Sequence, residues 1–399
     1  MCMEDMQRIH EINVVWVTRS FLDYRIPVYE ELSKRCSEFH VIYNGEVVPQ
    51  KVQQKAKELL GDRLIPMAGE LKIKSKNQSY SNIANKGFRI PFQPNLIRTI
   101  RNLKPDVVIS DGFFQWTYAA LWIRLFNMRG IKHVMCYEKT LHTERNAGRL
   151  RTLYRKFVSR WIDAIDCNGI LTEQYVRSLG YKRKTTFGHM VADVEGMSKK
   201  TAAVSELDVN ALRDKLQLSD VNFIYVGRLI PLKGIMELLR AWKTADLSNA
   251  SLLLVGEGEQ RPEIEKFICE NSLSSVKLLG RVDYDLLTPY YKSADCFIIP
   301  TLEDNWSLVV PEAMACGLPI ACSIYNGCFP ELVTESNGWT FDPLKEDAVI
   351  EVLREVVETK ERLKEMGKAS QRIVAKYTPK HAADGIYEAC MYALNKLNK

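Results

Sequence analysis

The sequence lacks several features that would each define a class of protein. No apolar run reaches the length of a membrane-spanning helix, and the best candidate, residues 118–126, is short and contains Arg124. The start, Met1-Cys-Met-Glu-Asp5, is acidic and polar, unlike a secretory signal. No short-period repeat or low-complexity tract occurs. We therefore expect a cytoplasmic protein, either free or peripheral on the inner face of the cytoplasmic membrane.

Paired cysteines are also missing. The ten cysteines are scattered without a Cys-x-x-Cys pair, and the evenly spaced Cys316, Cys322 and Cys328 have no histidine near them in sequence. This pattern favours reduced, mostly buried thiols over a metal site. The only Asp-x-Asp, Asp283-Tyr-Asp285, fits a helix start, where acids are favoured. We expect neither a metal ion nor another cofactor.

The chain is too long for one ordinary core, since 399 residues exceed the usual size of a single domain. Its composition, with 46% hydrophobic and 26% charged residues, is that of a globular protein. The net charge of +6 is unevenly distributed, because residues 1–200 carry +13 and residues 201–399 carry −7. Residues 71–160 alone hold 18 basic against 4 acidic residues. A surface this basic favours phosphates, nucleic acid or an anionic bilayer.

Basic residues and bulky aromatics alternate in two stretches of this first half. The first stretch has Lys72, Lys74, Lys76, Lys86 and Arg89 near Tyr80, Phe88 and Phe92; the second has Arg149, Arg151, Arg155, Lys156 and Arg160 near Tyr154, Phe157 and Trp161. Such a mixture fits a membrane surface as well as it fits an ordinary solvated face. We expect no nucleic acid partner, because no recognisable binding motif is present.

Apolar runs alternate with helix-like stretches along the whole chain, which predicts parallel βαβ units. In the first half we expect strands at 12–17, 39–43, 107–110, 133–137 and 164–171, with helices at 25–35, 94–103, 117–128 and 149–162. In the second half we expect strands at 223–226, 251–255, 276–279, 296–299, 320–322 and 339–341. The polar stretch 195–220 marks the seam, with 198–203 as its loosest part.

This organisation predicts an α/β protein of two doubly wound, Rossmann-like domains, with the ligand in the cleft between them at the carboxyl ends of the strands. The first domain covers residues 1–200 and the second covers 201–378. An amphipathic helix over 379–399 follows and can pack back on the first domain.

The most informative segment is 300–319, which follows the predicted strand 296–299. Asp304 lies in a turn, and Glu312 lies on the following helix with seven residues between them. Ser307 is a candidate N-cap, Gly317 a candidate C′ residue, and Pro319 a stop. Free backbone N–H groups at a helix start suit an anion, and the two carboxylates suit a ligand with hydroxyl groups. A nucleotide sugar carries both anionic phosphates and hydroxyl groups.

Three more motifs each place glycine at the end of a predicted strand of the second half. In the stretch 225–234, Gly227 permits a tight turn, and Arg228 and Lys233 can reach a diphosphate. The stretches 254–259 and 279–282 are weaker signals, each as consistent with a structural turn as with a ligand site.

Taken together, these four motifs resemble the C-terminal domain of the retaining glycosyltransferases of family 4, which have the GT-B fold. The resemblance is strong over about 221–345 and covers the first half in outline. The family signature is two glutamates with seven residues between them; here Glu312 is the second, while Asp304 holds the first position and Glu303 precedes it. The resemblance implies that Glu312 holds the ribose and that Asp304 or Glu303 lies against the sugar.

The resemblance also assigns further residues to the two substrates. The implied donor-binding residues are Gly227, Arg228, Lys233, Gly256, Arg281, Val282, Glu303, Asp304, Asn305, Trp306, Ser307, Leu308 and Glu312. Candidates for the acceptor site, at strand ends of the first half, are Arg19, Asp23, Arg25, Asp111 and Glu138. The expected catalytic residues are Asp304, Glu312, Arg228, Lys233 and His142.

The resemblance implies transfer of a sugar from a nucleoside diphosphate sugar to an acceptor hydroxyl, with retention at the anomeric carbon. The basic, aromatic first half favours an acceptor that is lipid-linked or a precursor of a surface polysaccharide, at an anionic membrane surface. Two alternatives stay open. One is a nucleotide-sugar epimerase of the same fold, and the other is a non-catalytic subunit that binds a nucleotide sugar.

Overall fold

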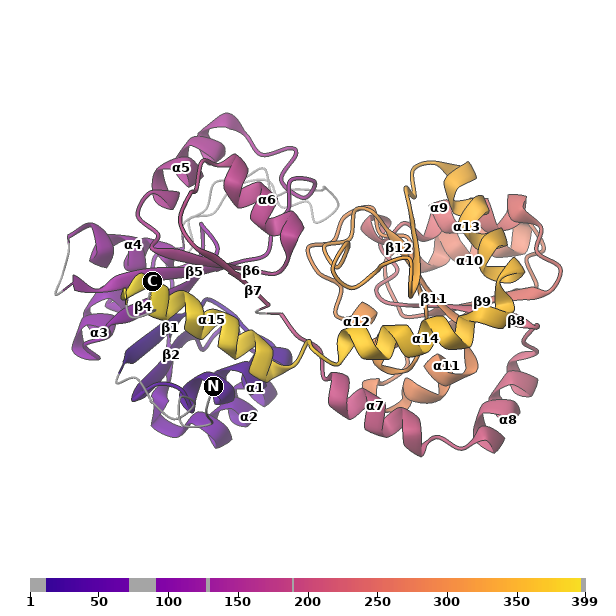
Figure 1. Cartoon of the computed structure of the whole chain (residues 1–399), viewed down its shortest axis with the longest axis horizontal. Helices are drawn as coiled ribbons and strands as arrows, with labels where there is room; N and C mark the ends of the chain where they lie inside the picture. Colours follow the sequence, from indigo (N-terminus) through magenta and orange to yellow (C-terminus); the bar gives the residue numbers. More distant parts are fainter. Residues whose placement is uncertain (1–11, 72–90, 127–129, 189, 396–399) are drawn as a thin grey trace, which may run out of the picture. The chain divides into compact units, whose positions relative to one another are not determined.

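The computed structural model describes residues 12–71, 91–126, 130–188 and 190–395 (Figure 1). The chain forms two units, one of Met1–Val191 with Pro379–Lys399 and one of Ala192–Thr378. The boundary expected between residues 200 and 201 falls inside a helix, α7 (Val194–Ala203). The basic stretch with Lys72, Lys74, Lys76, Lys86 and Arg89 lies outside the described residues.

The first unit is built on a seven-stranded sheet in the order β3-β2-β1-β4-β5-β6-β7, with every neighbouring pair parallel. Its strands are β1 (Asn13–Val17), β2 (Glu38–Asn44), β3 (Leu64–Met67), β4 (Val107–Asp111), β5 (Lys132–Tyr137), β6 (Ala164–Cys167) and β7 (Thr185–Phe187). Its helices are α1 (Ile26–Ser33), α2 (Gln50–Leu60), α3 (Leu96–Asn102), α4 (Thr117–Leu125), α5 (Arg149–Ser159), α6 (Ile170–Ser178) and α15 (Pro379–Ala393).

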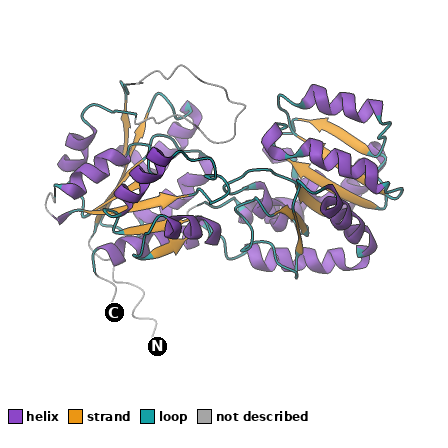
Figure 2. Cartoon of the chain, turned by 90° about the horizontal axis from the view of Figure 1, so that it is seen from above, coloured by secondary structure: helices purple, strands orange, loops and turns teal. Residues whose placement is uncertain are grey.

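Both faces of this sheet are buried, which explains its nearly continuous apolar strands. Along β1, Val14 and Trp16 belong to a core shared with α1, α2 and α15. The alternate residues Val15 and Val17 point to the other face, into a core shared with α3 and α4. On that same face, α5 and α6 pack over β5 and β6. Helices therefore cover both faces (Figure 2).

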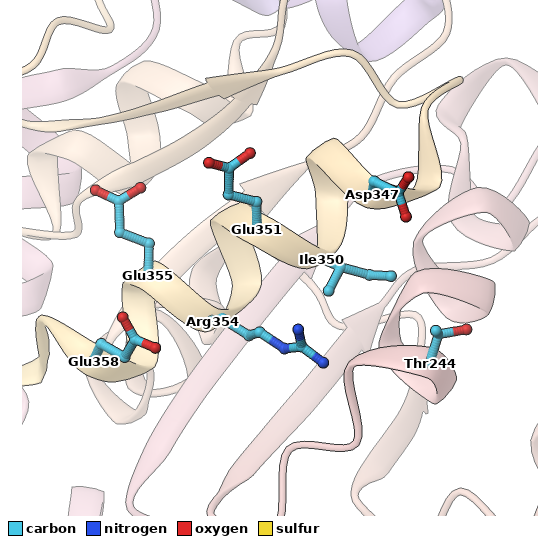
Figure 3. A pocket seen from close by; sticks show the side chains of 7 residues that line it. All are labelled: Thr244, Asp347, Ile350, Glu351, Arg354, Glu355 and Glu358. Carbon is cyan, nitrogen blue, oxygen red and sulfur yellow. The ribbon is translucent and has the colours of Figure 1, made fainter.

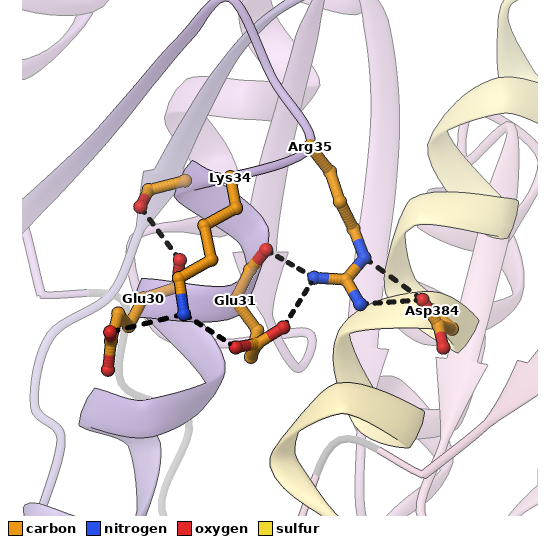
Figure 4. A network of polar contacts seen from close by, with 6 residues as sticks. Glu30, Glu31, Lys34, Arg35 and Asp384 are labelled. Carbon is orange, nitrogen blue, oxygen red and sulfur yellow. Dashed lines mark hydrogen bonds and ion pairs between the residues drawn. The ribbon is translucent and has the colours of Figure 1, made fainter. Parts of the chain in front are cut away.

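The C-terminal helix α15 belongs to the first unit although it follows the whole second unit in sequence. Its buried residues Ala382, Ala383, Ile386, Ala389 and Cys390 join the core beneath α1. Arg35, just after α1, binds Asp384 of α15 with 2.7 Å between Nη2 and Oδ1, and also binds Glu31 (Figure 4). Apolar burial and this polar network together hold the helix in place.

The second unit is built on a six-stranded sheet in the order β10-β9-β8-β11-β12-β13, again with parallel neighbours throughout. Its strands are β8 (Val221–Val226), β9 (Ala250–Val255), β10 (Val276–Gly280), β11 (Cys296–Ile299), β12 (Ile320–Ser323) and β13 (Gly338–Phe341). Its helices are α7, α8 (Glu206–Leu216), α9 (Ile235–Ala245), α10 (Arg261–Glu270), α11 (Thr288–Ser293), α12 (Val309–Ala315), α13 (Glu346–Glu358) and α14 (Lys360–Val374).

The prediction of two doubly wound α/β domains is confirmed by these two parallel sheets. Several local predictions are wrong. The apolar run 164–171 is not one strand, because β6 ends at Cys167 and Gly169 caps the start of α6. The polar seam 195–220 is mostly the helices α7 and α8, which pack on α11 and are not loose. Strands β3 and β7, which lie at the sheet edges, were not predicted.

No helix among the described residues has the length and apolarity required to cross a bilayer.

Candidate active site

The order of the second sheet reverses between β8 and β11. From β8 the chain proceeds outward to β9 and β10, and from β11 it proceeds in the opposite direction to β12 and β13. At such a switch point the loops after the two central strands diverge to cover opposite faces, which leaves a crevice at the carboxyl edge. The loops concerned are 227–234 and 300–308, the two that carry the strongest sequence motifs.

These two loops are joined by their backbones. Leu302 donates its N–H to the carbonyl of Leu232 over 2.9 Å, and the Thr301 hydroxyl donates to the same carbonyl over 2.9 Å. A Cβ on Gly234 would lie 2.1 Å from the carbonyl oxygen of Pro300, and Gly234 has a φ of 67°. Glycine is therefore required here both for its conformation and for the close approach.

The side chains of Lys233 and Asp304 form an ion pair between the two loops. They are 17% and 15% exposed, so the pair is largely shielded from solvent. Asp304 accepts further hydrogen bonds from the backbone N–H of Trp306, at 3.2 Å, and from the hydroxyl of Ser307. Both carboxylate oxygens of Asp304 thus have donors within the protein, and the Lys233 ammonium keeps N–H groups for other acceptors.

The prediction that Ser307 is the N-cap is wrong. Helix α12 begins at Val309, after Leu308, and no side chain caps it. The Ser307 hydroxyl is used by Asp304 and by Asn326, whose Nδ2 donates to it over 2.9 Å. At the other end, the prediction for Gly317 is confirmed, since it follows the C-cap residue Cys316 with a φ of 84°.

The turn 305–308 is packed against the loop after β12. Gly327 approaches so closely that a Cβ would lie 1.6 Å from the Asn305 carbonyl oxygen. Trp306 is 5% exposed, and its ring lies 6.4 Å from that of Tyr377. Asn305 and Leu308 are partly exposed. The turn is therefore held in shape by residues distant in sequence, and of these Asn326 and Gly327 were missed by sequence reasoning.

Glu312 lies in the first turn of α12 and is 9% exposed. Burial, reinforced by the nearby negative charge of Asp193, raises the pKa of its carboxyl to about 8. No ion pair or side-chain hydrogen bond neutralises it among the described residues. Asp193, the N-cap of α7, was not identified from the sequence, because only the fold brings it near Glu312. A buried carboxyl whose pKa is raised this far is unusual enough to mark a candidate functional position.

Arg228 and Gly227 lie at the start of the first loop. Arg228 is exposed, and its carbonyl accepts a hydrogen bond of 2.9 Å from the hydroxyl of the buried Tyr225. Tyr225 therefore fixes the backbone while the guanidinium remains at the surface of the unit. The neighbouring loop explains Gly256, where a Cβ would lie 1.8 Å from the Gly227 carbonyl oxygen. Gly256 thus has a structural reason to be glycine, whether or not a ligand approaches it.

The loop after β10 lies at the same carboxyl edge of the sheet. Arg281 is exposed, and its side chain makes no polar contact with a described residue. Val282 is half-buried. The Asp-x-Asp motif lies nearby, at the start of a 3₁₀ turn, Tyr284–Leu286, for which Asp283 is the N-cap residue. Asp285 forms an ion pair with Lys200 of α7. That ion pair gives Asp285 a structural partner.

In the first unit, two of the candidate acceptor residues at the ends of β1 and β4 are engaged with each other. Arg25 and Asp111 form a buried ion pair with 3.0 Å between Nη1 and Oδ1. The indole N–H of Trp16 also donates to Asp111, and the Arg25 guanidinium lies over the Trp16 ring. Asp23 is exposed beside them. The Arg25–Asp111 pair therefore anchors the turn after β1, and Asp23 is more accessible than either of its members.

Arg19 is held by a carboxylate that sequence reasoning missed. Its Nε lies 2.9 Å from Oε2 of Glu70, whose side chain is fully buried. The indole N–H of Trp116 donates to the same oxygen over 3.0 Å. The Arg19 side chain is 34% exposed, so it is partly accessible although its Nε is anchored by Glu70.

The loop after β5 carries Glu138 and His142, both half-buried. Its shape depends on Glu144, which binds Arg155 of α5 with 2.7 Å between Oε2 and Nη1; the two side chains are only 3% and 2% exposed. Arg155 also donates to the Tyr175 hydroxyl over 2.6 Å. The structure thus removes Arg155 from the basic surface that the sequence suggested, and makes it an internal anchor for the loop.

A hollow on the second unit lies away from these loops. It has a volume of about 570 Å³ between α9 and α13, and its lining is mainly acidic (Figure 3). Its lining residues are Thr244, Asp347, Ile350, Glu351, Arg354, Glu355 and Glu358. None of them belongs to the strand-end loops. An acidic hollow would repel a diphosphate, so we do not assign the donor to it.

Two family models match the chain. Glycosyl transferases group 1 matches residues 209–373, and Glycosyltransferase Family 4 matches residues 29–187, so the matches fall on different units. An uncharacterised glycosyltransferase of Methanocaldococcus jannaschii is 25% identical over 179 residues, 45% of this chain and 48% of that protein. Lipopolysaccharide 1,2-N-acetylglucosaminetransferase of Salmonella typhimurium is 27% identical over 192 residues, 44% and 50% respectively. The chain thus matches about half the length of these relatives.

Solved structures extend the likeness to the whole fold. Sucrose-phosphate synthase of Thermosynechococcus elongatus superposes with a TM-score of 0.65 at 18% identity, over 94% of this chain and 98% of that one. The Anabaena protein HepE in complex with UDP superposes with a TM-score of 0.69 at 15% identity, over 94% and 99%. At such low identity the likeness concerns the arrangement of the chain, which is that of the GT-B fold.

Proposed function

The chain belongs to glycosyltransferase family 4, and from this premise we propose that it transfers a sugar from a nucleoside diphosphate sugar to a hydroxyl group of an acceptor. The observation that carries the proposal is the meeting of loops 227–234 and 300–308 at the switch point of the second sheet. There, Lys233 and Asp304 are paired, and the buried carboxyl of Glu312 lies on the helix that follows. Cations beside hydroxyl-binding carboxyls suit a nucleotide sugar.

In this proposal the donor lies along the carboxyl edge of the second sheet. Arg228 and Lys233 hold the diphosphate, and their charges stabilise it as it leaves the anomeric carbon. Glu312 accepts hydrogen bonds from the ribose hydroxyls. Gly227, Gly256, Arg281 and Val282 line the approach to the base and the ribose, and the N–H groups of residues 305–308 face the sugar and phosphate.

Asp304 and Glu303 have different roles in this proposal. Both oxygens of Asp304 already accept hydrogen bonds within the protein, from Trp306 on one side and from Lys233 and Ser307 on the other. We therefore assign Asp304 to positioning Lys233, and Glu303, which is half-buried in the same loop, to the sugar hydroxyls. Aspartate in place of glutamate is consistent with this division, because its shorter side chain reaches Lys233 and the turn.

We propose that transfer retains the anomeric configuration, as the resemblance to the retaining family implies. We also propose that it needs no metal ion, because the two cations supply the charge that a metal would otherwise bring. No group of three or more His, Cys, Asp or Glu side chains suited to a metal occurs among the described residues. On the acceptor side, Arg19, Asp23 and Glu138 are the more accessible polar groups, and His142 is the candidate base. Arg25 and Asp111 act by holding the turn that presents Asp23.

The acceptor in this proposal is lipid-linked or a precursor of a surface polysaccharide, on the cytoplasmic face of a membrane. One relative at 27% identity is named for acting on lipopolysaccharide, and another at 29% identity is a sulfoquinovosyl transferase of Arabidopsis thaliana. The basic first half, with 18 basic and 4 acidic residues over 71–160, agrees with an anionic surface nearby.

The test begins with the donor. HepE was solved with UDP and with UDP-glucose, which makes these the first ligands to try. Each UDP and GDP sugar would be screened for a rise in melting temperature, since a ligand that binds the native state stabilises it.

A donor that binds would then be incubated with the protein, with and without a membrane extract. Sugar transfer that needs the extract supports the proposal. Conversion of the donor alone to another nucleotide sugar would indicate an epimerase, and tight binding without any turnover would indicate a non-catalytic subunit.

A further inference from the structure

Helix α5 has an exposed apolar stripe. Leu150, Leu153 and Phe157 are 81%, 61% and 48% exposed. Their spacing of three and four residues places them on one side of the helix. Single exposed apolar residues are common, but three in register on one short helix form a continuous surface.

Three exposed cations, Arg149, Lys156 and Arg160, flank this stripe. Their helical positions fall beside one another, along one border of the stripe. No acidic residue occurs from 149 to 160, and none of the three forms an ion pair with a described residue. We call these six residues the α5 face. It combines apolar side chains with unneutralised positive charge.

The opposite side of α5 is fixed in the first unit. Val158 and Ser159 are buried, and Val158 belongs to the core that α5 shares with α4 and α6. Arg155 is buried in its ion pair with Glu144, and the Arg151 guanidinium lies over the ring of Phe114. The helix is thus anchored on one side, and the α5 face is presented by a rigid support.

We propose that the α5 face docks on the surface of a bilayer that contains anionic lipids. Leucine and phenylalanine side chains enter the boundary between headgroups and acyl chains, and arginine and lysine at the border reach the lipid phosphates. The absence of acidic residues distinguishes this face from a typical surface for a protein partner, where charges of both signs occur. The inference rests on the proposed function only for its purpose, which is to bring a lipid-linked acceptor to the first unit.

The docking experiment uses the full chain and vesicles of phosphatidylcholine with phosphatidylglycerol, separated by sedimentation. We expect binding at low salt that weakens as salt or the neutral lipid fraction rises. The double variant Leu150→Ser/Leu153→Ser should bind about tenfold more weakly, because the inserted apolar area is lost. The matched control is Leu207→Ser/Leu286→Ser in the second unit, whose leucines are 81% and 62% exposed. It should bind like the unmodified protein.

Charge is tested separately with Lys156→Glu/Arg160→Glu, against Arg362→Glu/Lys364→Glu, an exposed pair on α14. Only the first pair should abolish binding. Absence of binding to anionic vesicles at low salt would overturn the proposal, as would equal losses in the variants and their controls. If the charge variant lost vesicle binding and the leucine variant kept it, the proposal would also be overturned, because the protein would then adsorb to the vesicle without inserting its apolar side chains. Donor binding is measured in a separate experiment without vesicles. A failure of the proposed function would therefore not be mistaken for a failure of docking.

Discussion

Lys233 and Asp304 are 71 residues apart in sequence and form an ion pair where the loops after β8 and β11 meet. The pair has two consequences. It holds the ammonium group at the strand ends, where the proposed diphosphate would bind, and it occupies the carboxylate that the family signature would assign to the sugar. Substitutions at the two positions separate these roles.

Replacing Lys233 with alanine should lower sugar transfer by about 100-fold, because one positive charge that stabilises the leaving diphosphate is lost. The fold should persist, since the side chain lies in a loop. The measurement is turnover at saturating donor, beside a circular dichroism spectrum. Lys243→Ala, at an exposed position of α9, is the matched control and should keep full activity. A folded Lys233→Ala protein with ordinary turnover would refute the diphosphate assignment.

Asp304→Asn and Glu303→Gln should differ in kind. The neutral amide of Asp304→Asn would weaken the contacts to Lys233 and Ser307, which should lower both transfer and the free energy of unfolding, the latter by about 2 kcal/mol. Glu303→Gln should lower transfer, because the neutral amide is a weaker acceptor for the sugar hydroxyls. Loss of transfer by Asp304→Asn with undiminished stability would instead place Asp304 on the sugar itself. Glu335→Gln, in a surface turn of the same unit, serves as the control.

Glu312 should make stability depend on pH between about 5 and 8. Its folded-state pKa is raised to about 8, above the ordinary value near 4.5, so the folded protein binds a proton that the unfolded chain releases over this range. Stability should therefore fall as pH rises through the window, by up to about 1.4 kcal/mol per pH unit.

The variant Glu312→Gln should lack this dependence and be the more stable protein at pH 8.5. Denaturant unfolding at pH 5, 7 and 8.5 measures the difference. Glu361→Gln, exposed on α14, should show the same pH profile as the unmodified protein. Parallel profiles for Glu312→Gln and the unmodified protein would show that the carboxyl is ionised throughout.

Transfer should persist in excess EDTA, because Arg228 and Lys233 supply the positive charge at the diphosphate. The assay compares initial rates with and without the chelator, with a magnesium-dependent enzyme in parallel to verify that chelation is complete. Loss of activity that magnesium restores would disprove metal-free transfer.

Much of the fold could be predicted from the sequence because parallel strands buried on both faces leave nearly continuous apolar runs. The runs at 223–226, 251–255 and 296–299 lie within or coincide with β8, β9 and β11. The failures have physical causes. Run 164–171 joins a strand to the apolar start of α6, and hydrophobicity does not distinguish the two. The short edge strands β3 and β7 bury fewer residues and leave a weaker signal.

The sequence by itself determined the two α/β units, the place of the glycine-rich strand ends and the family, because these depend on local patterns of burial and backbone freedom. Only the tertiary structure decided which charges are available. It pairs Lys233 with Asp304, and it buries Arg25 with Asp111 and Arg155 with Glu144. It also leaves Glu312 beside Asp193, with no cation from the described part of the chain paired to it. Neutralisation depends on contacts between segments distant in the chain, and no local pattern of residues records those contacts.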